Sequence, residues 1–189
     1  MRELGFKYRG LVWCVFAVAV LFFPVSFSPA GIYAAIPLLF AGQSLRFWAA
    51  GFIPKYRTLV LDAPNLVTGG PYAWIRNPLY AGNGIMGLGW TLMVGWKWAV
   101  SFALIYLTLY SFTIIPFEEK FLLERFGDEY ASYKKNTPSL FPAISDFTPR
   151  AERSRAGFDA KKSWFMERHS LVMNVVVTAL ILSRLYFSV

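Results

Sequence analysis

The sequence is poor in the two residue types that most often hold metals or serve as nucleophiles and bases. It contains one cysteine, Cys14, and one histidine, His169, in 189 residues. A single cysteine cannot form a disulfide within the chain, and this pair cannot supply the ligands of a structural zinc site. A single histidine placed beside a basic residue at the start of an apolar run does not indicate a Ser-His-Asp triad. We therefore expect no metal cofactor.

Charged residues are also scarce. They make up 16% of the chain, whereas 56% of the residues are hydrophobic and 19% are aromatic. A soluble domain of this length would carry more charge and shorter apolar runs. The composition predicts an integral membrane protein that forms a single domain over residues 1–189.

Apolar runs divide the chain into candidate membrane-spanning helices, each of which needs about 20 mostly apolar residues. The third run is short, so we expect its helix to lie in a thin part of the membrane or to begin inside a cavity. We predict an all-α membrane protein with five transmembrane helices, over residues 10–27, 31–52, 79–94, 98–116 and 170–187.

The distribution of charge predicts the orientation. All eleven acidic residues fall on one side of the predicted membrane, with nearly all of the basic residues, and only Lys97 and Arg184 fall on the other side. The positive-inside rule then places the N-terminus in the cytosol and the C-terminus outside. We expect the protein in the inner membrane of a bacterium. The surplus of positive charge is explained by topology and anionic lipid, so we expect no nucleic-acid partner.

The largest cytosolic segment is predicted to cover residues 117–169. Its first part, Phe117–Lys135, has apolar and aromatic residues at three- and four-residue spacing, which indicates an amphipathic helix lying in the membrane interface. Gly127 is expected to break or bend this helix. Ser145–Lys162 is polar and basic, and we expect a mobile linker there.

The most informative motif is GGPYAWIRNPLYAGN, residues 69–83. Pro78 suits the first turn of a helix, where its missing N–H is unpaired anyway, and Asn77 suits the N-cap before it. Arg76 and Tyr80 then lie at the cytosolic mouth of the third helix. Each residue alone is explained by a capped helix with interfacial anchors, whereas the group together indicates a site.

Glycines follow this motif at positions 82, 84, 87 and 89. Each weakens a helix by about 1 kcal/mol relative to alanine. Small residues in membrane helices permit the close approach of a second helix or of a ligand, and the sequence leaves both interpretations open.

Two acids, Glu118 and Glu119, lie at the matching depth at the end of the fourth run. Adjacent helical residues point about 100° apart. Both therefore face one place only if the helix is broken, and Pro116 can supply the break. A solvated acidic helix end is the alternative, but an acid near a helix C-terminus is unfavourable with the helix dipole and needs a partner. Ribose hydroxyls are suitable partners for a carboxylate.

Arg46 lies within the second run, near its cytosolic end. A charged arginine at this depth in the membrane has a high free-energy cost, and such residues usually have a function. The sequence allows two interpretations: extension of the side chain to the interface, or a clamp for a carboxylate or phosphate.

These motifs together resemble the membrane-embedded methyltransferases, which include isoprenylcysteine carboxyl methyltransferases and phospholipid N-methyltransferases. The family pattern is Arg-His-Pro-x-Tyr-x-Gly, an apolar helix, and then Glu-Glu. The resemblance covers roughly Leu45–Pro142, and the bacterial branch is the most similar. It rests on LRFWAAG at 45–51, GPYAWIRNPLY at 70–80, the pair Glu118-Glu119 and FGDEYASYKKNTPSLFP at 126–142.

The resemblance implies S-adenosylmethionine as the cofactor, held between the start of the third helix and the end of the fourth. It also implies a lipid or prenylated acceptor that comes from the bilayer. The expected cofactor-binding residues are Arg76, Asn77, Pro78, Tyr80, Gly82, Gly84, Glu118 and Glu119.

The chain departs from the family pattern at Asn77, which replaces the histidine. Asparagine can form hydrogen bonds but cannot take a proton near neutral pH. A carboxylate acceptor needs no base, whereas an amine acceptor would need one, such as Tyr80, Glu167 or water. We therefore favour carboxyl O-methylation over phospholipid or aminolipid N-methylation, and expect catalytic roles for Arg46, Tyr80 and Glu167.

A non-catalytic transporter or assembly protein on the same scaffold is the alternative from another class. A transporter would place polar groups near the middle of the membrane. The first, third and fourth apolar runs have almost none there, which disfavours transport.

Overall fold

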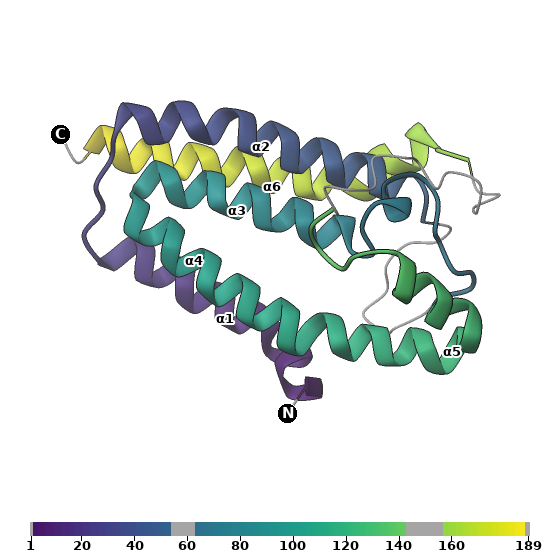
Figure 1. The fold of residues 1–189 in the computed structure, drawn as a ribbon. Helices are drawn as coiled ribbons and strands as arrows, with labels where there is room; N and C mark the ends of the chain where they lie inside the picture. Colours follow the sequence, from purple (N-terminus) through teal and green to yellow (C-terminus); the bar gives the residue numbers. More distant parts are fainter. Residues whose placement is uncertain (1, 54–62, 143–156, 188–189) are drawn as a thin grey trace. The chain divides into compact units, whose positions relative to one another are not determined.

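A computed structural model of the chain describes residues 2–53, 63–142 and 157–187 (Figure 1). Within these ranges the regular structure is entirely helical, which confirms the predicted all-α class. The elements are α1 (Arg2–Phe22), α2 (Pro29–Ala50), the 3₁₀ turn η1 (Gly70–Ala73), α3 (Pro78–Val94), α4 (Trp96–Leu109), the π turn η2 (Tyr110–Ile114), α5 (Ile115–Asn136) and α6 (Ala160–Phe187).

The last helix begins ten residues before the predicted start at residue 170. Asp159 provides the reason, because its side chain accepts a hydrogen bond from the backbone N–H of Lys162 at 3.0 Å. This is the N-cap interaction that satisfies a donor in the first turn of a helix. The predicted linker Ser145–Lys162 therefore ends inside α6, and its residues up to 156 lie outside the described part of the chain.

The first helix differs from the prediction at both ends, because α1 begins at Arg2 and ends at Phe22. Pro24 explains its end, since the residue before a proline is disfavoured in helical conformation. The bounds of α2 and α3 lie within two residues of the predicted ones.

The fourth predicted helix does not end near Pro116 but continues as α5 to Asn136. Pro116 cannot donate a hydrogen bond to the carbonyl of Phe112, and its ring crowds that carbonyl. The π turn η2 contains Phe112 and widens the helix just before the proline, so the helix accommodates Pro116 without ending. The predicted bend at Gly127 is confirmed, because this residue has φ 50° and ψ −126° inside α5.

The chain forms two compact units. The first comprises residues 1–41, 84–117 and 172–189, and within it α1 runs beside α4 (Figure 1). Aromatic rings fill this contact: the Trp13 ring centre of α1 lies 5.2 Å from that of Phe102 and 5.7 Å from that of Tyr106, both in α4. Such ring pairs contribute about 0.5–1.5 kcal/mol each beyond their buried area.

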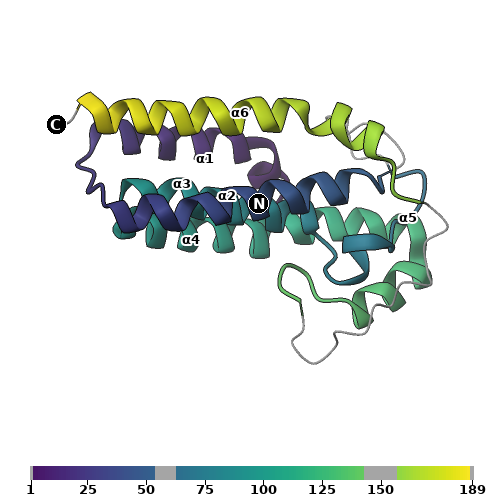
Figure 2. The ribbon, with the colours of Figure 1, turned by 90° about the horizontal axis from the view of Figure 1, so that it is seen from above.

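Within the first unit α3 also packs closely on α2 and α4 (Figure 1, Figure 2). A Cβ atom added at Gly87 would lie 2.0 Å from Phe102 of α4, and one at Gly89 would lie 3.2 Å from Leu39 of α2. Helix α6 joins this unit through a hydrogen bond of 3.1 Å from Trp90 to Thr178. The glycines of this part of α3 therefore permit close helix packing.

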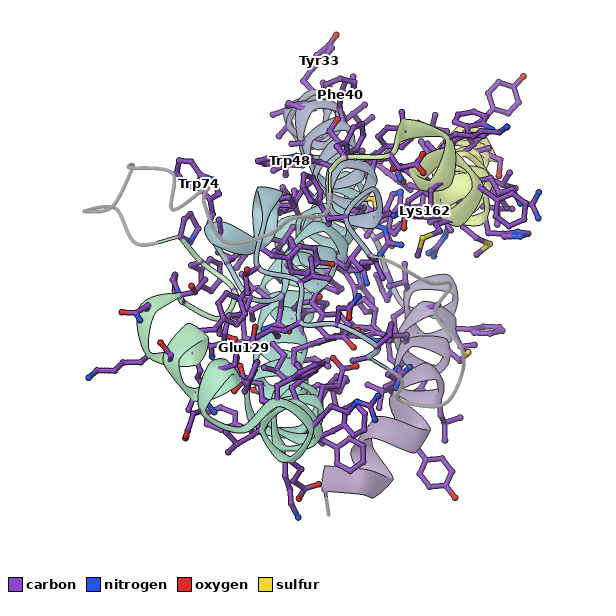
Figure 3. The ribbon with its side chains drawn as sticks, turned by 90° about the vertical axis from the view of Figure 1, so that its right-hand side faces the viewer. Tyr33, Phe40, Trp48, Trp74, Glu129 and Lys162 are labelled. Carbon is purple, nitrogen blue, oxygen red and sulfur yellow. The ribbon has the colours of Figure 1, made fainter. Side chains whose placement is uncertain are left out.

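The outer surface of the first unit is strongly apolar. Tyr33 and Phe40 project away from α2 with 73% and 76% of their surface exposed (Figure 3). Two helices, Trp96–Asn136 and Ala160–Arg184, are long and apolar enough to cross a membrane, and Tyr8–Val20 is a shorter apolar helix. Five membrane-spanning helices remain a prediction.

We predict that Gly87→Ala lowers the thermal stability of the protein, measured by unfolding in detergent. The added methyl group would overlap the ring of Phe102, and overpacking of this kind costs about 1–3 kcal/mol. Gly10→Ala is the matched control, because nothing lies within 4 Å of a Cβ atom at this exposed helical position. Gly10→Ala should leave stability unchanged or raise it. Equal stability of the two variants would contradict the packing account.

Candidate active site

The second unit comprises residues 42–83 and 118–171 and contains the residues at the start of α3. Pro78 is the first residue of α3, as predicted, and the carbonyl of Asn77 accepts the N–H of Ala81 at 2.9 Å. The side-chain nitrogen of Asn77 donates to the carbonyl and hydroxyl oxygens of Ser139, at 3.3 and 3.2 Å. Asn77 therefore occupies the N-cap position while its side chain binds a distant segment.

Arg76 forms a buried ion pair with Glu119 of α5. Its Nε and Nη2 atoms lie 2.9 and 2.6 Å from one oxygen of Glu119, and the two side chains are 11% and 8% exposed. The other oxygen of Glu119 lies 2.8 Å from the ammonium group of Lys134. Glu119 therefore holds two cations, and both of its oxygens are used within the protein.

The segment Thr137–Ser139 lies against the start of α3, where backbone hydrogen bonds hold it. Arg76 donates its N–H to the carbonyl of Pro138 at 2.8 Å, and Asn77 donates its N–H to Ser139 at 3.1 Å. The Arg76 side chain also donates to the carbonyls of Lys134 and Thr137. These bonds fix the backbone before α3 and leave the guanidinium group little freedom.

Glu118 contacts the same end of α3 one turn further along. It accepts a hydrogen bond from the hydroxyl of Tyr80, while Glu119 is paired with Arg76. The two acids therefore reach two different residues of the motif, and the helix does not need to break at Pro116 for both to do so. The structure brings together the two stretches of sequence that were predicted to share a site.

Tyr130 and Tyr133 belong to this cluster, although the spacing of apolar residues predicts only that they lie on the apolar side of an amphipathic helix. Burial raises the pKa of the Tyr130 phenol, and the nearby charge of Glu119 raises this pKa further. Burial also raises the pKa of Tyr133, whose hydroxyl donates to the carbonyl of Tyr72 at 2.7 Å. Both phenols remain neutral near pH 7, and Tyr130 is 1% exposed beside the ion pair.

A second polar cluster in the same unit surrounds Arg46. Its Nε and Nη2 atoms each lie 2.8 Å from a different oxygen of Glu167, and the side chains are 14% and 4% exposed. Its Nη1 atom donates to Asn83 at 2.6 Å, and Nε also donates to Ser170 at 3.1 Å. Gln43 donates to Glu167 at 3.3 Å. Arg46 is therefore paired inside the protein.

The cluster around Arg46 joins three helices. Gln43 and Arg46 are three residues apart on α2, and Glu167 and Ser170 have the same spacing on α6, so each pair shares a helix face. Asn83, Gln43 and Ser170 were not predicted as site residues. Of these three, only Gln43 could have been found from the sequence, because it lies one turn before Arg46 on the same predicted helix. Arg46 and Glu167 were both predicted as site residues, and the structure brings them together.

Neighbouring atoms fill the space that a side chain would need at the glycines near the site. A Cβ atom at Gly82 would lie 2.6 Å from the Arg46 side chain and 2.7 Å from the carbonyl of Gly42. One at Gly84 would lie 3.0 Å from the ring of Tyr106. Close helix packing explains both glycines, and their role in cofactor binding stays a prediction. No group of three or more metal-binding side chains was found among the described residues.

Comparison with known proteins adds to this geometry. A model of the phospholipid methyltransferase family matches residues 30–129. The cobalt-zinc-cadmium resistance protein CzcN of Cupriavidus metallidurans is 38% identical over 105 residues, which are 53% of this chain and 44% of that protein. The protein-S-isoprenylcysteine O-methyltransferase of Schizosaccharomyces pombe is 42% identical over 81 residues, which are 42% of this chain and 34% of that protein.

A longer match is to the nickel-cobalt-cadmium resistance protein NccN of Alcaligenes xylosoxydans xylosoxydans. It is 34% identical over 151 residues, which are 74% of this chain and 62% of that protein. The chain thus spans less than two thirds of the length of these curated relatives. No solved structure matches the chain. Because the family model covers slightly more than half of its residues, the chain belongs to the phospholipid methyltransferase family.

Proposed function

We propose that the chain is a membrane-embedded methyltransferase that uses S-adenosylmethionine and acts on a lipid-like or prenylated acceptor. The observation that carries the proposal is the meeting of two motifs in one cluster. Arg76 and Tyr80, at the start of α3, bind the adjacent acids Glu119 and Glu118 of α5. Membership of a family described by methyl transfer to phospholipids supports the same reaction type.

The cluster provides different candidate roles for its two carboxylates. Both oxygens of Glu119 are bound to Arg76 and Lys134, so Glu119 is suited to holding Arg76 in place. Glu118 contacts Tyr80 and is half-buried, whereas Glu119 is only 7% exposed, so Glu118 is the more accessible candidate to accept hydrogen bonds from the ribose hydroxyls of the cofactor. We assign binding of the rest of the cofactor to Asn77 and to the backbone around Pro78, Gly82 and Gly84.

The cofactor supplies a methyl group on a positively charged sulfur, which is a reactive electrophile. The protein is then required to align the acceptor atom with this methyl group and to exclude water. A carboxylate acceptor is already ionised, so Asn77 does not need to accept a proton. We therefore propose carboxyl O-methylation, as in the relatives named isoprenylcysteine O-methyltransferases, and assign orientation of the acceptor carboxylate to Arg46.

N-methylation of an aminolipid is the second candidate, and the description of the matched family favours it. An amine must lose a proton before or during the reaction. Tyr80 and Glu167 are the groups that we consider for this step, and both are engaged in hydrogen bonds that such a step would have to rearrange.

We further propose that the protein lies in a bacterial inner membrane, with its N-terminus in the cytosol. The two helices that are apolar enough to cross a membrane and the exposed apolar residues of α2 support a membrane location. A water-soluble cofactor would enter from the cytosol, and an apolar acceptor would enter from the bilayer.

We predict that S-adenosylhomocysteine binds the purified protein in detergent and that Glu118→Gln weakens this binding about tenfold or more, measured by isothermal titration. Loss of a charged hydrogen-bond acceptor costs about 1.5–3 kcal/mol, which corresponds to this factor. Glu124→Gln is the matched control, because Glu124 is an exposed acid on the same helix and forms an ion pair with the exposed Lys120. Absence of binding at millimolar ligand would refute the proposed function.

A second prediction separates the acceptor from the cofactor. Arg46→Lys keeps the positive charge but removes the fork of N–H groups that matches a carboxylate. We expect the dissociation constant of N-acetyl-S-farnesylcysteine, a prenylated carboxylate, to rise about tenfold, which is the loss of one charged hydrogen bond. The affinity for S-adenosylhomocysteine should stay unchanged. The reverse pattern would place Arg46 in the cofactor site.

A further inference from the structure

The guanidinium group of Arg46 already binds a carboxylate, and that carboxylate belongs to the protein. Glu167 uses both of its oxygens, each 2.8 Å from a different nitrogen of Arg46. This paired geometry is the one that arginine adopts with carboxylates in general. An acceptor carboxylate that approaches Arg46 therefore meets a site whose charge is neutralised by a group of the same chemistry.

Glu167 comes from a part of the chain outside the family match. Arg46 and Asn83 lie within the matched residues 30–129, whereas Glu167 and Ser170 lie on α6, after this range. Arg46 thus belongs to the region that the family model matches, whereas the carboxylate that pairs with it, Glu167, comes from a helix outside that region. Burial makes the interaction strong, because the Arg46 and Glu167 side chains are 14% and 4% exposed.

Glu167 has a second hydrogen-bond partner besides Arg46. The Gln43 side-chain amide donates to one oxygen of Glu167 at 3.3 Å, and the Ser170 hydroxyl donates to Gln43 at 3.2 Å. These partners would remain if Glu167 released the guanidinium group. Asn83 accepts a hydrogen bond from the opposite side of Arg46 and would hold the arginine in either state.

From this geometry, and on the basis of the proposed carboxyl methylation, we propose that Glu167 is a built-in competitor for the acceptor carboxylate at Arg46. Glu167 holds Arg46 when no acceptor is bound and yields it when the acceptor carboxylate binds. Glu167 thereby selects for acceptors whose other groups bind the protein strongly enough for the acceptor carboxylate to displace Glu167 from Arg46. Glu167 is a positioning and specificity-determining residue in this account.

The charges of substrate and product determine whether Glu167 or the bound molecule is favoured at Arg46. A carboxylate oxygen forms a bond to the methyl carbon while the carbon–sulfur bond breaks and its electron pair stays on the sulfur. The acceptor anion and the sulfonium cation become a neutral ester and a neutral thioether, and no proton is released. A neutral ester competes poorly for a guanidinium group, so Glu167 regains Arg46 and favours release of the product.

The test compares the binding of N-acetyl-S-farnesylcysteine and of its methyl ester to the full-length protein in detergent. Glu167→Gln removes the competing charge and preserves the shape of the side chain. We expect the acid to bind about tenfold or more tightly to this variant, as expected for one charged hydrogen bond, while the ester changes by less than about twofold. Glu124→Gln removes an exposed acid and should change neither affinity.

A second variant covers the case in which Glu167→Gln does not fold. Glu167→Asp keeps the charge but shortens the side chain, so that it reaches Arg46 less well, and the acid should again gain affinity while the ester does not. Unchanged or weaker acid binding in the folded variant, or no binding of either compound, would overturn the competitor role. Binding of S-adenosylhomocysteine in the same samples shows whether the proposed function itself has failed.

Discussion

The buried ion pair between Arg76 and Glu119 is the interaction on which the arrangement of the site depends. It joins the backbone just before α3 to α5, and both side chains are almost fully enclosed. Removal of one partner of such a pair typically costs about 3–5 kcal/mol, because the other charge is left buried without compensation. Lys134 and the carbonyls of the Thr137–Ser139 segment complete the set of partners. The pair therefore fixes where Tyr80 and Glu118 meet.

Helix α3 connects the two polar clusters of the second unit. Tyr80 contacts Glu118 near the expected cofactor site, and Asn83, one turn later, contacts Arg46 near the expected acceptor site. Residues three apart on a helix share a face, so the start of α3 can present both groups to neighbouring places. This spacing gives a physical reason why a short motif can serve a reaction between two bound molecules.

Local features of the fold could be predicted from the sequence because single residues determine them. Pro78 begins α3, and Gly127 bends α5 through a positive φ that other residues rarely adopt. The effect of Pro116 was not predicted correctly, since the π turn before it lets the helix continue. The early start of α6 depends on the cap at Asp159, which lies in a polar stretch without apolar periodicity.

Contacts between distant residues were harder to predict. The resemblance paired the motif at Arg76 with the two acids, but no pattern indicated that Tyr130 is buried beside them. The partner of Arg46 could not be recognised either, because Glu167 lies on another helix, 121 positions away. Hydropathy and spacing describe one helix at a time, whereas these pairs depend on how the helices pack.

Transfer of a labelled methyl group tests the central claim most directly. Membranes that contain the protein would be incubated with S-adenosylmethionine labelled in its methyl group, and the label in the lipid-soluble fraction would be measured. The account predicts labelling that alkali releases, as expected for a methyl ester, and that is lost in Glu118→Gln. Labelling no higher than in membranes without the protein, or labelling unchanged in that variant, would contradict the account.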